Sequence, residues 1–303
     1  MRLCRFRHRG SSPSREGHPA EGDGGRLGVV DGDAIRDVTP ALDLLPASRY
    51  PFPRHDLLIA ALPDLRDRIE RIAVDAPPLP IEQATLLSPV ANPGKLIAAP
   101  VNYQTHLDEV RGDAALHQHN PAHTVTIHSA GVFLKASSSL VGAGDGVTLC
   151  QPERRTDHEI ELACVIGSRA KAVTRDEALS HVAGYAIGLD ITIRGSEDRS
   201  LRKSADTYSV LGPWLVTPDE IRDPSALDLT LDVNGEPRQR SNTRHLILGV
   251  AELIELASRF YTLYPGDVIF TGTPDGVGPI QGGDIMRATI SGIGTMEVQV
   301  HGD

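Results

Sequence analysis

The ten residues DHEIELACVI, from Asp157 to Ile166, carry the strongest structural signal in the chain. Acidic and apolar side chains alternate at the start of this stretch, and an uninterrupted apolar run follows. On a β-strand, successive side chains point to opposite faces, so Glu159 and Glu161 would share one face while Ile160 and Leu162 share the other. The stretch therefore predicts a strand that enters a hydrophobic core and begins with two carboxylates.

A second predicted strand, Gly184 to Arg194, contributes a third acid, because Asp190 interrupts an otherwise apolar run. A buried carboxylate needs a partner, and Arg194 or a metal ion are the candidates. Oxygen ligands favour a hard cation, so Glu159, Glu161 and Asp190 predict a site for magnesium, with manganese or calcium as alternatives. For Glu159 and Glu161 taken alone, a solvated acidic strand edge is the competing interpretation.

Composition excludes several classes of function. The 303 residues contain 30 Lys and Arg against 40 Asp and Glu, and the net charge of -10 repels nucleic acid and anionic membranes. Three cysteines without metal-binding spacing favour a reducing, cytoplasmic setting. The apolar runs are too short to cross a bilayer, and the first residues lack the apolar stretch of a secretory signal. We therefore expect a cytoplasmic protein without a nucleic-acid or membrane partner.

The chain divides into two predicted domains, a small N-terminal domain over residues 1–90 and a β-dominated catalytic domain over 91–303. In the first, patterning predicts strands at 1–9 and 26–38, a loop over 10–25 and a helix over 54–73. In the second it predicts strands at 95–99, 147–149, 159–166, 183–193, 229–233, 267–271, 284–290 and 294–300, and helices at 103–116, 175–181 and 246–263. The fold class is thus α+β with a predominance of strands.

Eight short motifs occur in order along the chain. They are Asn102-Tyr103-x-x-His106-x-x-Glu109, Phe133-Leu134-Lys135, Glu159-x-Glu161, Gly184-Tyr185, Asp190-x-x-x-Arg194, Lys203-Ser204-x-Asp206-Thr207, Leu211-Gly212-Pro213-Trp214 and Thr271-Gly272-Thr273-Pro274-x-Gly276-Val277-Gly278. Their order and spacing together closely resemble the fumarylacetoacetate hydrolase family over about residues 95 to 300. The resemblance implies a mixed β-sheet roll, a homodimer, and magnesium held by Glu159, Glu161 and Asp190.

The resemblance also implies a reaction class. Family members hydrolyse acylpyruvates such as fumarylpyruvate, decarboxylate oxaloacetate, or isomerise and decarboxylate hydroxymuconate-type acids such as 2-hydroxyhepta-2,4-dienedioate, in each case through a metal-bound enolate. We expect a hydrolase that cleaves a C–C bond in a 2,4-dioxo acid during aromatic-compound catabolism, with isomerase or decarboxylase activity at the same site as the alternative. A non-catalytic protein that binds a metal or a carboxylate, and a β-barrel iron dioxygenase, are alternatives of other classes.

His106 and Glu109 are the expected catalytic pair. Their spacing places them on one face of a helix, where a carboxylate that orients a histidine makes it a better general base. A surface helix pair is the alternative, but the family pattern favours catalysis from a lid over the metal. Lys203 is expected to stabilise developing oxyanions, and a salt bridge, for example to Asp206, is its alternative role.

Substrate contacts are expected from five further residues: Tyr103, Lys135, Arg194, Gln239 and Thr273. The Thr271–Gly278 segment offers backbone N–H groups suited to a carboxylate, or it is simply a tight turn. Two features depart from the family pattern. The Gly195–Leu201 segment is charged where many members carry aromatic or amide residues, which leaves the substrate open. The lid region is rich in histidine, and an exposed loop is favoured over a transition-metal site formed by His117, His119, His123 and His128.

Overall fold

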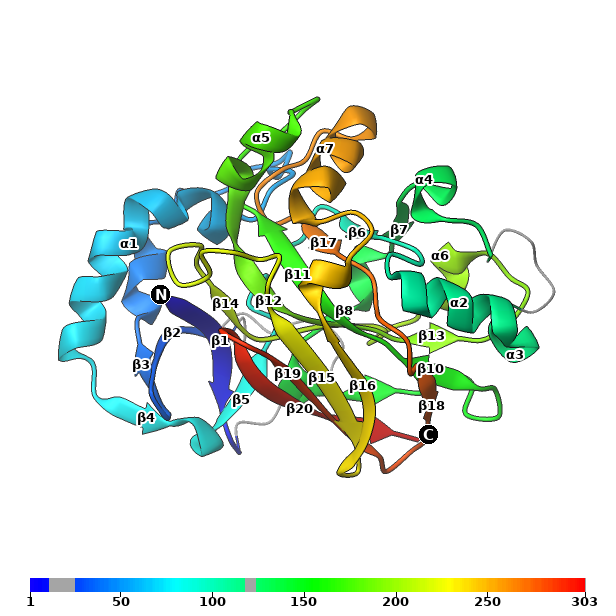
Figure 1. Ribbon diagram of the computed structural model, residues 1–303. Helices are drawn as coiled ribbons and strands as arrows, with labels where there is room; N and C mark the ends of the chain where they lie inside the picture. Colours follow the sequence, from blue (N-terminus) through cyan, green and yellow to red (C-terminus); the bar gives the residue numbers. More distant parts are fainter. Residues whose placement is uncertain (11–24, 118–123, 303) are drawn as a thin grey trace.

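The computed structural model describes residues 1–10, 25–117 and 124–302 (Figure 1). The loop expected over residues 10–25, and the lid residues His119 and His123, therefore lie almost entirely outside the described residues. None of the helices that are described combines the length and the apolar character that a membrane span requires.

A mixed sheet, twelve-stranded in the described part of the chain, forms the centre of the molecule. Its order is β4 (Pro78–Pro80), β3 (Ala34–Asp37), β2 (Arg26–Asp31), β1 (Arg2–His8), β14 (Ser209–Val216), β12 (Val182–Asp190), β11 (Ile160–Ile166), β17 (Val268–Phe270), β6 (Leu96–Ala98) and β7 (Phe133–Lys135), with β5 (Ala84–Leu87) beside β1 and β8 (Leu140–Val141) beside β14. The pairs β6–β17 and β8–β14 are parallel and the other pairs are antiparallel, which confirms the predicted mixed sheet.

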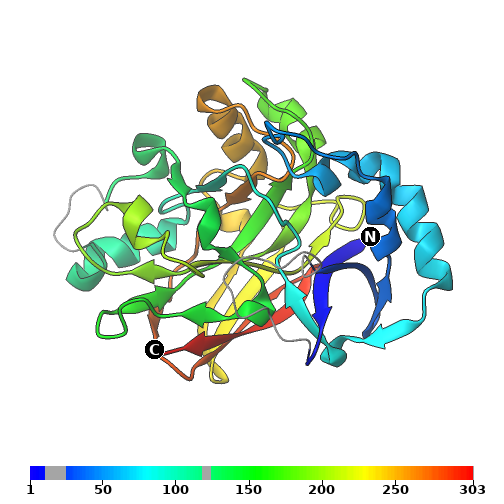
Figure 2. The ribbon, with the colours of Figure 1, turned by 180° about the vertical axis from the view of Figure 1, so that it is seen from behind.

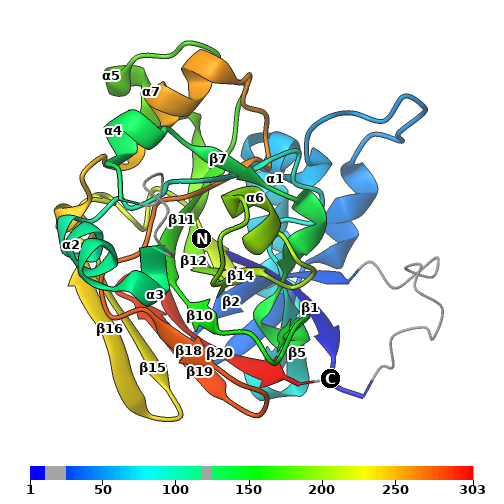
Figure 3. The ribbon, with the colours of Figure 1, turned by 90° about the vertical axis from the view of Figure 1, so that its right-hand side faces the viewer.

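Two smaller sheets complete the β-structure. The five-stranded sheet has the order β16 (Glu236–Asn242), β15 (Asp228–Val233), β19 (Ile285–Ile290), β20 (Gly294–His301) and β9 (Val147–Thr148), and the three-stranded sheet has the order β13 (Thr192–Ile193), β10 (Thr156–His158) and β18 (Gly278–Ile280). The five-stranded sheet packs against β11, β12 and β14, as its yellow and red strands show in Figures 1 and 3. The β-dominated α+β fold predicted from the sequence is confirmed.

The core lies on both faces of the large sheet. Along β11, Leu162, Cys164 and Ile166 belong to a cluster shared with the five-stranded sheet. Ala163 and Val165 point the other way, into a cluster shared with α1 (Leu57–Asp75). The predicted alternation along this strand is therefore confirmed. The carboxylate of Asp56 caps α1 by accepting from Ile59 N at 3.0 Å, and the helix covers the N-terminal strands (Figure 2).

The remaining helices are short. They are α2 (Gln104–Gly112), α3 (Ala114–His117), α4 (Ile127–Ala130), α5 (Arg175–Ala178), α6 (Arg199–Arg202) and α7 (Val250–Phe260), with 3-10 turns at Thr39–Leu44, Ile81–Gln83, Ser137–Ser139, Ala143–Asp145, Leu179–His181 and Thr243–His245. The helix predicted over 103–116 is in fact two, because the backbone of Asp113 is extended and its side chain accepts from Ala115 N at 2.8 Å. The helix predicted over 246–263 begins only after Gly249.

The sequence patterns did not predict strands β14 and β16. β14 contains Gly212-Pro213, residues that depress strand signals, and its pairing with β12 shifts register opposite them. β16 is mostly polar. The proposed domain boundary at residue 90 stays a prediction; β1 is hydrogen-bonded between β2 and β14, so the large sheet extends across that boundary.

Candidate active site

Three carboxylates meet where β11 begins and β12 ends. The antiparallel register pairs Ile160 with Leu189, so Glu159 lies beside Asp190, and Asp190 N donates to the Glu159 carbonyl oxygen at 2.9 Å. One oxygen from each of Glu159, Glu161 and Asp190 lies within 4.8 Å of the others, and all three residues are buried. The sheet ladder thus brings together the three acids that the sequence nominated.

Two of these acids, Glu159 and Asp190, form hydrogen bonds with buried lysine side chains. Lys203 Nζ donates to Glu159 and to Asp190, at 2.8 Å in each case, and to Thr192 Oγ1 at 2.6 Å. Lys135 Nζ contacts the other oxygen of Asp190 and donates to the Tyr208 carbonyl at 2.8 Å. Asp190 therefore has two lysine partners.

These contacts bear on two ion pairs that the sequence offered as alternatives. Arg194 does not bond Asp190; it donates to Asp157 at 2.7 Å and to Glu159 at 3.0 Å, because β13 directs its guanidinium toward β10. The salt bridge that was the alternative role of Lys203 does form, with Glu159 and Asp190, whereas Asp206, the example named, is not among the groups that this lysine contacts.

The acids differ in their electrostatics. Burial would raise the pKa of Glu159, but Lys203 and Arg194 hold it well below its usual range. The pKa of Glu161 is raised well above its usual value by burial and by the charges of Asp190 and Glu159. Its carboxylate accepts one hydrogen bond, from Gly272 N at 2.6 Å. A buried acid with two acidic neighbours fits a site for a hard divalent cation, which would supply the compensating charge.

The expected catalytic pair forms on α2. His106 Nδ1 lies 2.9 Å from Glu109 Oε2, and Glu109 Oε1 accepts from Gly276 N at 2.9 Å. A carboxylate on Nδ1 favours the tautomer in which that nitrogen carries the proton, so Nε2 is left as the basic atom. His106 is 5% exposed and lines the same cavity as the three acids. The arrangement can therefore deliver a base to a molecule bound at the carboxylates.

Backbone N–H groups of the segment after β17 donate hydrogen bonds to two of the protein's own carboxylates. Gly272 N binds Glu161 and Gly276 N binds Glu109, whereas a substrate carboxylate was the expected ligand. Gly276 has a φ of 88°, and a Cβ there would lie 2.2 Å from the Arg238 carbonyl oxygen, so only glycine fits this close approach. The Thr271–Gly278 segment thus fixes one acid of the cluster and the partner of His106.

A cavity of about 50 Å³ contains the site. Its lining comprises Ala99, Pro100, Val101, His106, Val110, Leu116, Phe133, Glu159, Glu161, Asp190, Arg194, Arg199, Arg202, Lys203 and Thr273. Of the residues expected to contact substrate, Arg194 and Thr273 line this cavity, whereas Tyr103, Lys135 and Gln239 are buried and are not among its lining residues. Val101, a β-branched residue with a φ of 49°, adds backbone strain at the cavity.

Gln239 is placed to organise the site. Its Oε1 accepts from Ile160 N at 3.0 Å and lies 3.1 Å from His158 Nδ1, while its Nε2 donates to Thr273 Oγ1 at 2.8 Å and to the Pro274 carbonyl at 3.0 Å. This single side chain links β10, the start of β11 and the Thr271–Gly278 segment. Its amide is engaged by the protein itself.

Sequence reasoning missed Arg199 and Arg202. Both lie on α6, inside the charged Gly195–Leu201 region or directly after it, and both line the cavity. The signal was present in that unusual charge pattern. What the pattern could not show is that α6 faces the three acids.

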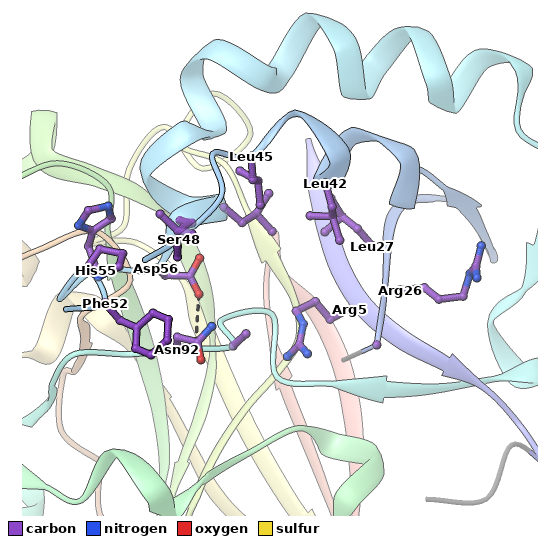
Figure 4. Close-up of a pocket in the computed structure, with 15 residues that line it drawn as sticks. Arg5, Arg26, Leu27, Leu42, Leu45, Ser48, Phe52, His55, Asp56 and Asn92 are labelled. Atoms are coloured by element: carbon purple, nitrogen blue, oxygen red, sulfur yellow. Dashed lines mark hydrogen bonds between the residues drawn. The ribbon is translucent and has the colours of Figure 1, made fainter. Parts of the chain in front are cut away.

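A second cavity, of about 500 Å³, is lined by residues of β1 and β2, by the segment from Leu42 to the start of α1, and by Ala91 and Asn92 (Figure 4). Its polar groups serve the fold: Asp56 caps α1 and accepts from Asn92 N at 3.1 Å, the dashed line in Figure 4, and Arg5 donates to the Ser88 carbonyl at 3.0 Å. Its lining contains one carboxylate, that of Asp56. The groups that can do chemistry are therefore concentrated in the smaller cavity.

Comparison with known proteins gives consistent matches. A family model described as fumarylacetoacetate (FAA) hydrolase C-terminal matches residues 95–301. A maleylpyruvate hydrolase from Aquipseudomonas alcaligenes is 53% identical over 99% of both chains. A maleylpyruvate hydrolase from Sphingobium sp. SYK-6, solved with manganese(II) and pyruvate, is 39% identical with a TM-score of 0.80, covering 100% of this chain and 99% of that one. A 5-carboxymethyl-2-hydroxymuconate delta-isomerase from Mycobacterium smegmatis is 30% identical with a TM-score of 0.69 over the whole of both chains.

Proposed function

The chain belongs to the fumarylacetoacetate hydrolase family, and from this premise we propose that it is a divalent-metal-dependent hydrolase that cleaves the C–C bond of an acylpyruvate. The observation that carries the proposal is the meeting of His106, held by Glu109, with three buried carboxylates in one cavity. Maleylpyruvate, named for the relative that is 53% identical, is the first substrate to test.

Glu159, Glu161 and Asp190 would hold the metal. We propose magnesium, with the manganese of the Sphingobium structure and calcium as alternatives. When bound, the cation polarises the 2-oxo group and offsets the negative charge that develops there. The raised pKa of Glu161 supports this assignment, because it shows a carboxylate whose burial is not balanced by a protein cation in contact with it.

His106 acts as the general base. It takes a proton from water, whose oxygen attacks the distal carbonyl carbon of the acylpyruvate. The bond between that carbon and the neighbouring CH₂ then breaks, and its electron pair goes to the pyruvate fragment as an enolate. Protonated His106 then gives the proton to the CH₂ carbon of this enolate, which becomes the methyl group of pyruvate. The products are pyruvate and the carboxylate of the acyl group, with one further proton released. Glu109 keeps the ring oriented and stabilises its charged form.

The two lysines have different roles. Lys203 lines the cavity, so its ammonium can also stabilise oxyanions that develop on the substrate. Lys135 is fully buried and is not among the lining residues, and burial lowers its pKa although Asp190 opposes the shift. We assign it to positioning Asp190 rather than to substrate contact.

Isomerisation is the second candidate, because the Mycobacterium smegmatis isomerase matches over the whole chain. The hydrogen bond from Gly276 N to Glu109 favours hydrolysis. It fixes the carboxylate that orients His106, and an oriented His106 is needed to activate water. A protein that binds metal without catalysis would turn over neither kind of substrate. The homodimer, the cytoplasmic location and the role in aromatic catabolism stay predictions.

The test is a screen of maleylpyruvate, fumarylpyruvate and a hydroxymuconate-type acid, monitored by loss of enol absorbance. We expect the acylpyruvates to give stoichiometric pyruvate, with activity lost in EDTA and restored by magnesium. Isomerised product without pyruvate would contradict the hydrolase assignment. Metal binding without turnover of any of the three acids would support the non-catalytic alternative.

A further inference from the structure

The wall of the active-site cavity is rich in cationic side chains. Its lining includes four cationic residues, Arg194, Arg199, Arg202 and Lys203, against the three acids of the cluster. A divalent cation on the acids would add two further positive charges at this wall. The whole chain carries a net charge of -10, so the positive charge is a local property of this cavity. Such a site favours a substrate with more than one negative charge.

The cations on α6 are held in place by a braced segment. Arg154 forms two hydrogen bonds to the Glu197 carboxylate, at 2.9 and 3.0 Å, and a third to the Arg194 carbonyl at 2.9 Å. Gly195 lies within this brace, and a Cβ there would come within 2.1 Å of Glu197 Oε2. The charged Gly195–Leu201 segment is therefore held in a defined conformation by these hydrogen bonds.

The three arginines of the wall differ in what they hold. Arg194 binds Asp157 and Glu159, next to the expected metal position. Arg202 is 4% exposed and donates to the Glu197 carbonyl at 2.8 Å and to the Ile193 carbonyl at 3.0 Å, which fixes α6 to the strand before it. Arg199 begins α6 and is half-buried, so it lies closer to solvent than Arg202.

The position of Arg199 suits the far end of a substrate. With the 2-oxo acid end of an acylpyruvate at a cation held by Glu159, Glu161 and Asp190, as proposed above, the acyl chain would extend along the rest of the lining, which includes Arg199. A guanidinium has five N–H donors and can bind a carboxylate through two of them while it keeps a protein partner. Burial lowers the pKa of Arg199, and the charges of Asp198 and Glu159 oppose this shift.

We infer that Arg199 binds a carboxylate at the far end of the acyl chain, and that it selects acylpyruvates ending in a carboxylate over those ending in a methyl group. This assignment rests on the proposed hydrolase function. Arg194 and Arg202 keep the neighbouring acids and α6 in place.

The experiment compares kcat/KM for fumarylpyruvate and for acetylpyruvate, which lacks the far carboxylate, in wild type, Arg199→Gln and Arg199→Lys. We expect Arg199→Gln to lower kcat/KM for fumarylpyruvate about 100-fold, mainly through KM, because a desolvated charge pair is lost. Arg199→Lys should lose roughly 10-fold, since lysine lacks the planar fork. Acetylpyruvate should change less than about 3-fold in both variants.

Controls separate recognition from folding. Arg175→Gln removes an arginine that is 65% exposed and paired with Glu252, and it should leave both substrates unchanged. Equal losses on the two substrates would show that Arg199 is structural, and no loss on either would show that it does not read the far carboxylate; both results overturn the inference. A wild-type enzyme that hydrolyses neither substrate overturns the proposed function, and this assignment with it.

Discussion

The floor of the active site, Glu159, Glu161 and Asp190, and its roof, His106 and Glu109 on α2, are held by different means. Glu161 and Asp190 lie on the paired strands β11 and β12, with Asp190 also opposite Ser209 of β14, and Glu159 directly precedes β11, so backbone pairing of the large sheet sets the positions of all three acids. The roof is tied to the rest of the site through a polar contact from Gly276 to Glu109. We therefore expect the three floor acids to determine whether a metal binds, and the two roof residues to determine which reaction follows.

The largest effect should come from the floor. Asp190→Asn removes a ligand charge and leaves Lys135 and Lys203 buried with one carboxylate fewer. We expect kcat/KM to fall by at least about 10⁴-fold, within the range that metal catalysis contributes, together with loss of magnesium binding in calorimetry. The exposed Asp206→Asn is the matched control. Tight magnesium binding by Asp190→Asn would show that the floor is not the metal site.

Removing the base in the roof should affect catalysis but not metal binding. We expect His106→Ala to lower the hydrolysis rate by about 10² to 10⁴-fold, the contribution typical of a general base. Magnesium affinity, measured by calorimetry, should persist, whereas the exchange of pyruvate methyl protons with deuterated water, followed by NMR, should slow together with hydrolysis, because His106 carries the proton of that carbon. His128→Ala, which removes an exposed histidine on α4, is the control. If hydrolysis continues unchanged in His106→Ala, the roof has no catalytic role.

A smaller loss is expected from the partner of the base. Glu109→Gln retains an oxygen that can accept from Gly276 N but removes the charge that stabilises protonated His106. We expect roughly a 10- to 100-fold lower kcat with little change in KM, measured by steady-state kinetics. A rise in KM with constant kcat would instead place Glu109 in substrate binding.

The smallest effect concerns stability of the floor without metal. The raised pKa of Glu161 favours the protonated form in the folded state. Its stabilising contribution is complete below the unfolded-state pKa of about 4.3 and is lost as the pH rises through the folded-state value. Glu161→Gln removes this titration. In EDTA, its Tm advantage over wild type should therefore grow between pH 5 and pH 8, on the order of 3 °C. A constant Tm difference would contradict this account.

The floor was predictable from the sequence because local pattern and chemistry coincide there. Alternation around Ile160 gives the strand, and an acid inside an apolar run marks Asp190. The partners of these acids were not predictable, because they depend on register between strands far apart in the chain. Arg194 lies four residues from Asp190, yet the turn into β13 sends it to Asp157.

The roof was predictable in its residues but not in its anchoring. The spacing of His106 and Glu109 on a helix was enough to place them together. The use of Gly276 N and Gly272 N for the protein's own acids could not be inferred, since a backbone donor carries no sequence signal beyond the glycine itself. Gln239 was noticed as a polar residue, but its strand, β16, lacks an apolar pattern.

The position of β1 also bears on how the chain acquires its fold during synthesis. Arg2 pairs with Val216, and β1 lies between β2 and β14 within the large sheet. β1 must therefore wait until β14, about 200 residues further along the chain, has been synthesised before this neighbour exists. Pairings of such long sequence separation slow folding and leave a strand edge open to other chains. The nascent protein should consequently depend on chaperones more than a protein built from local hairpins.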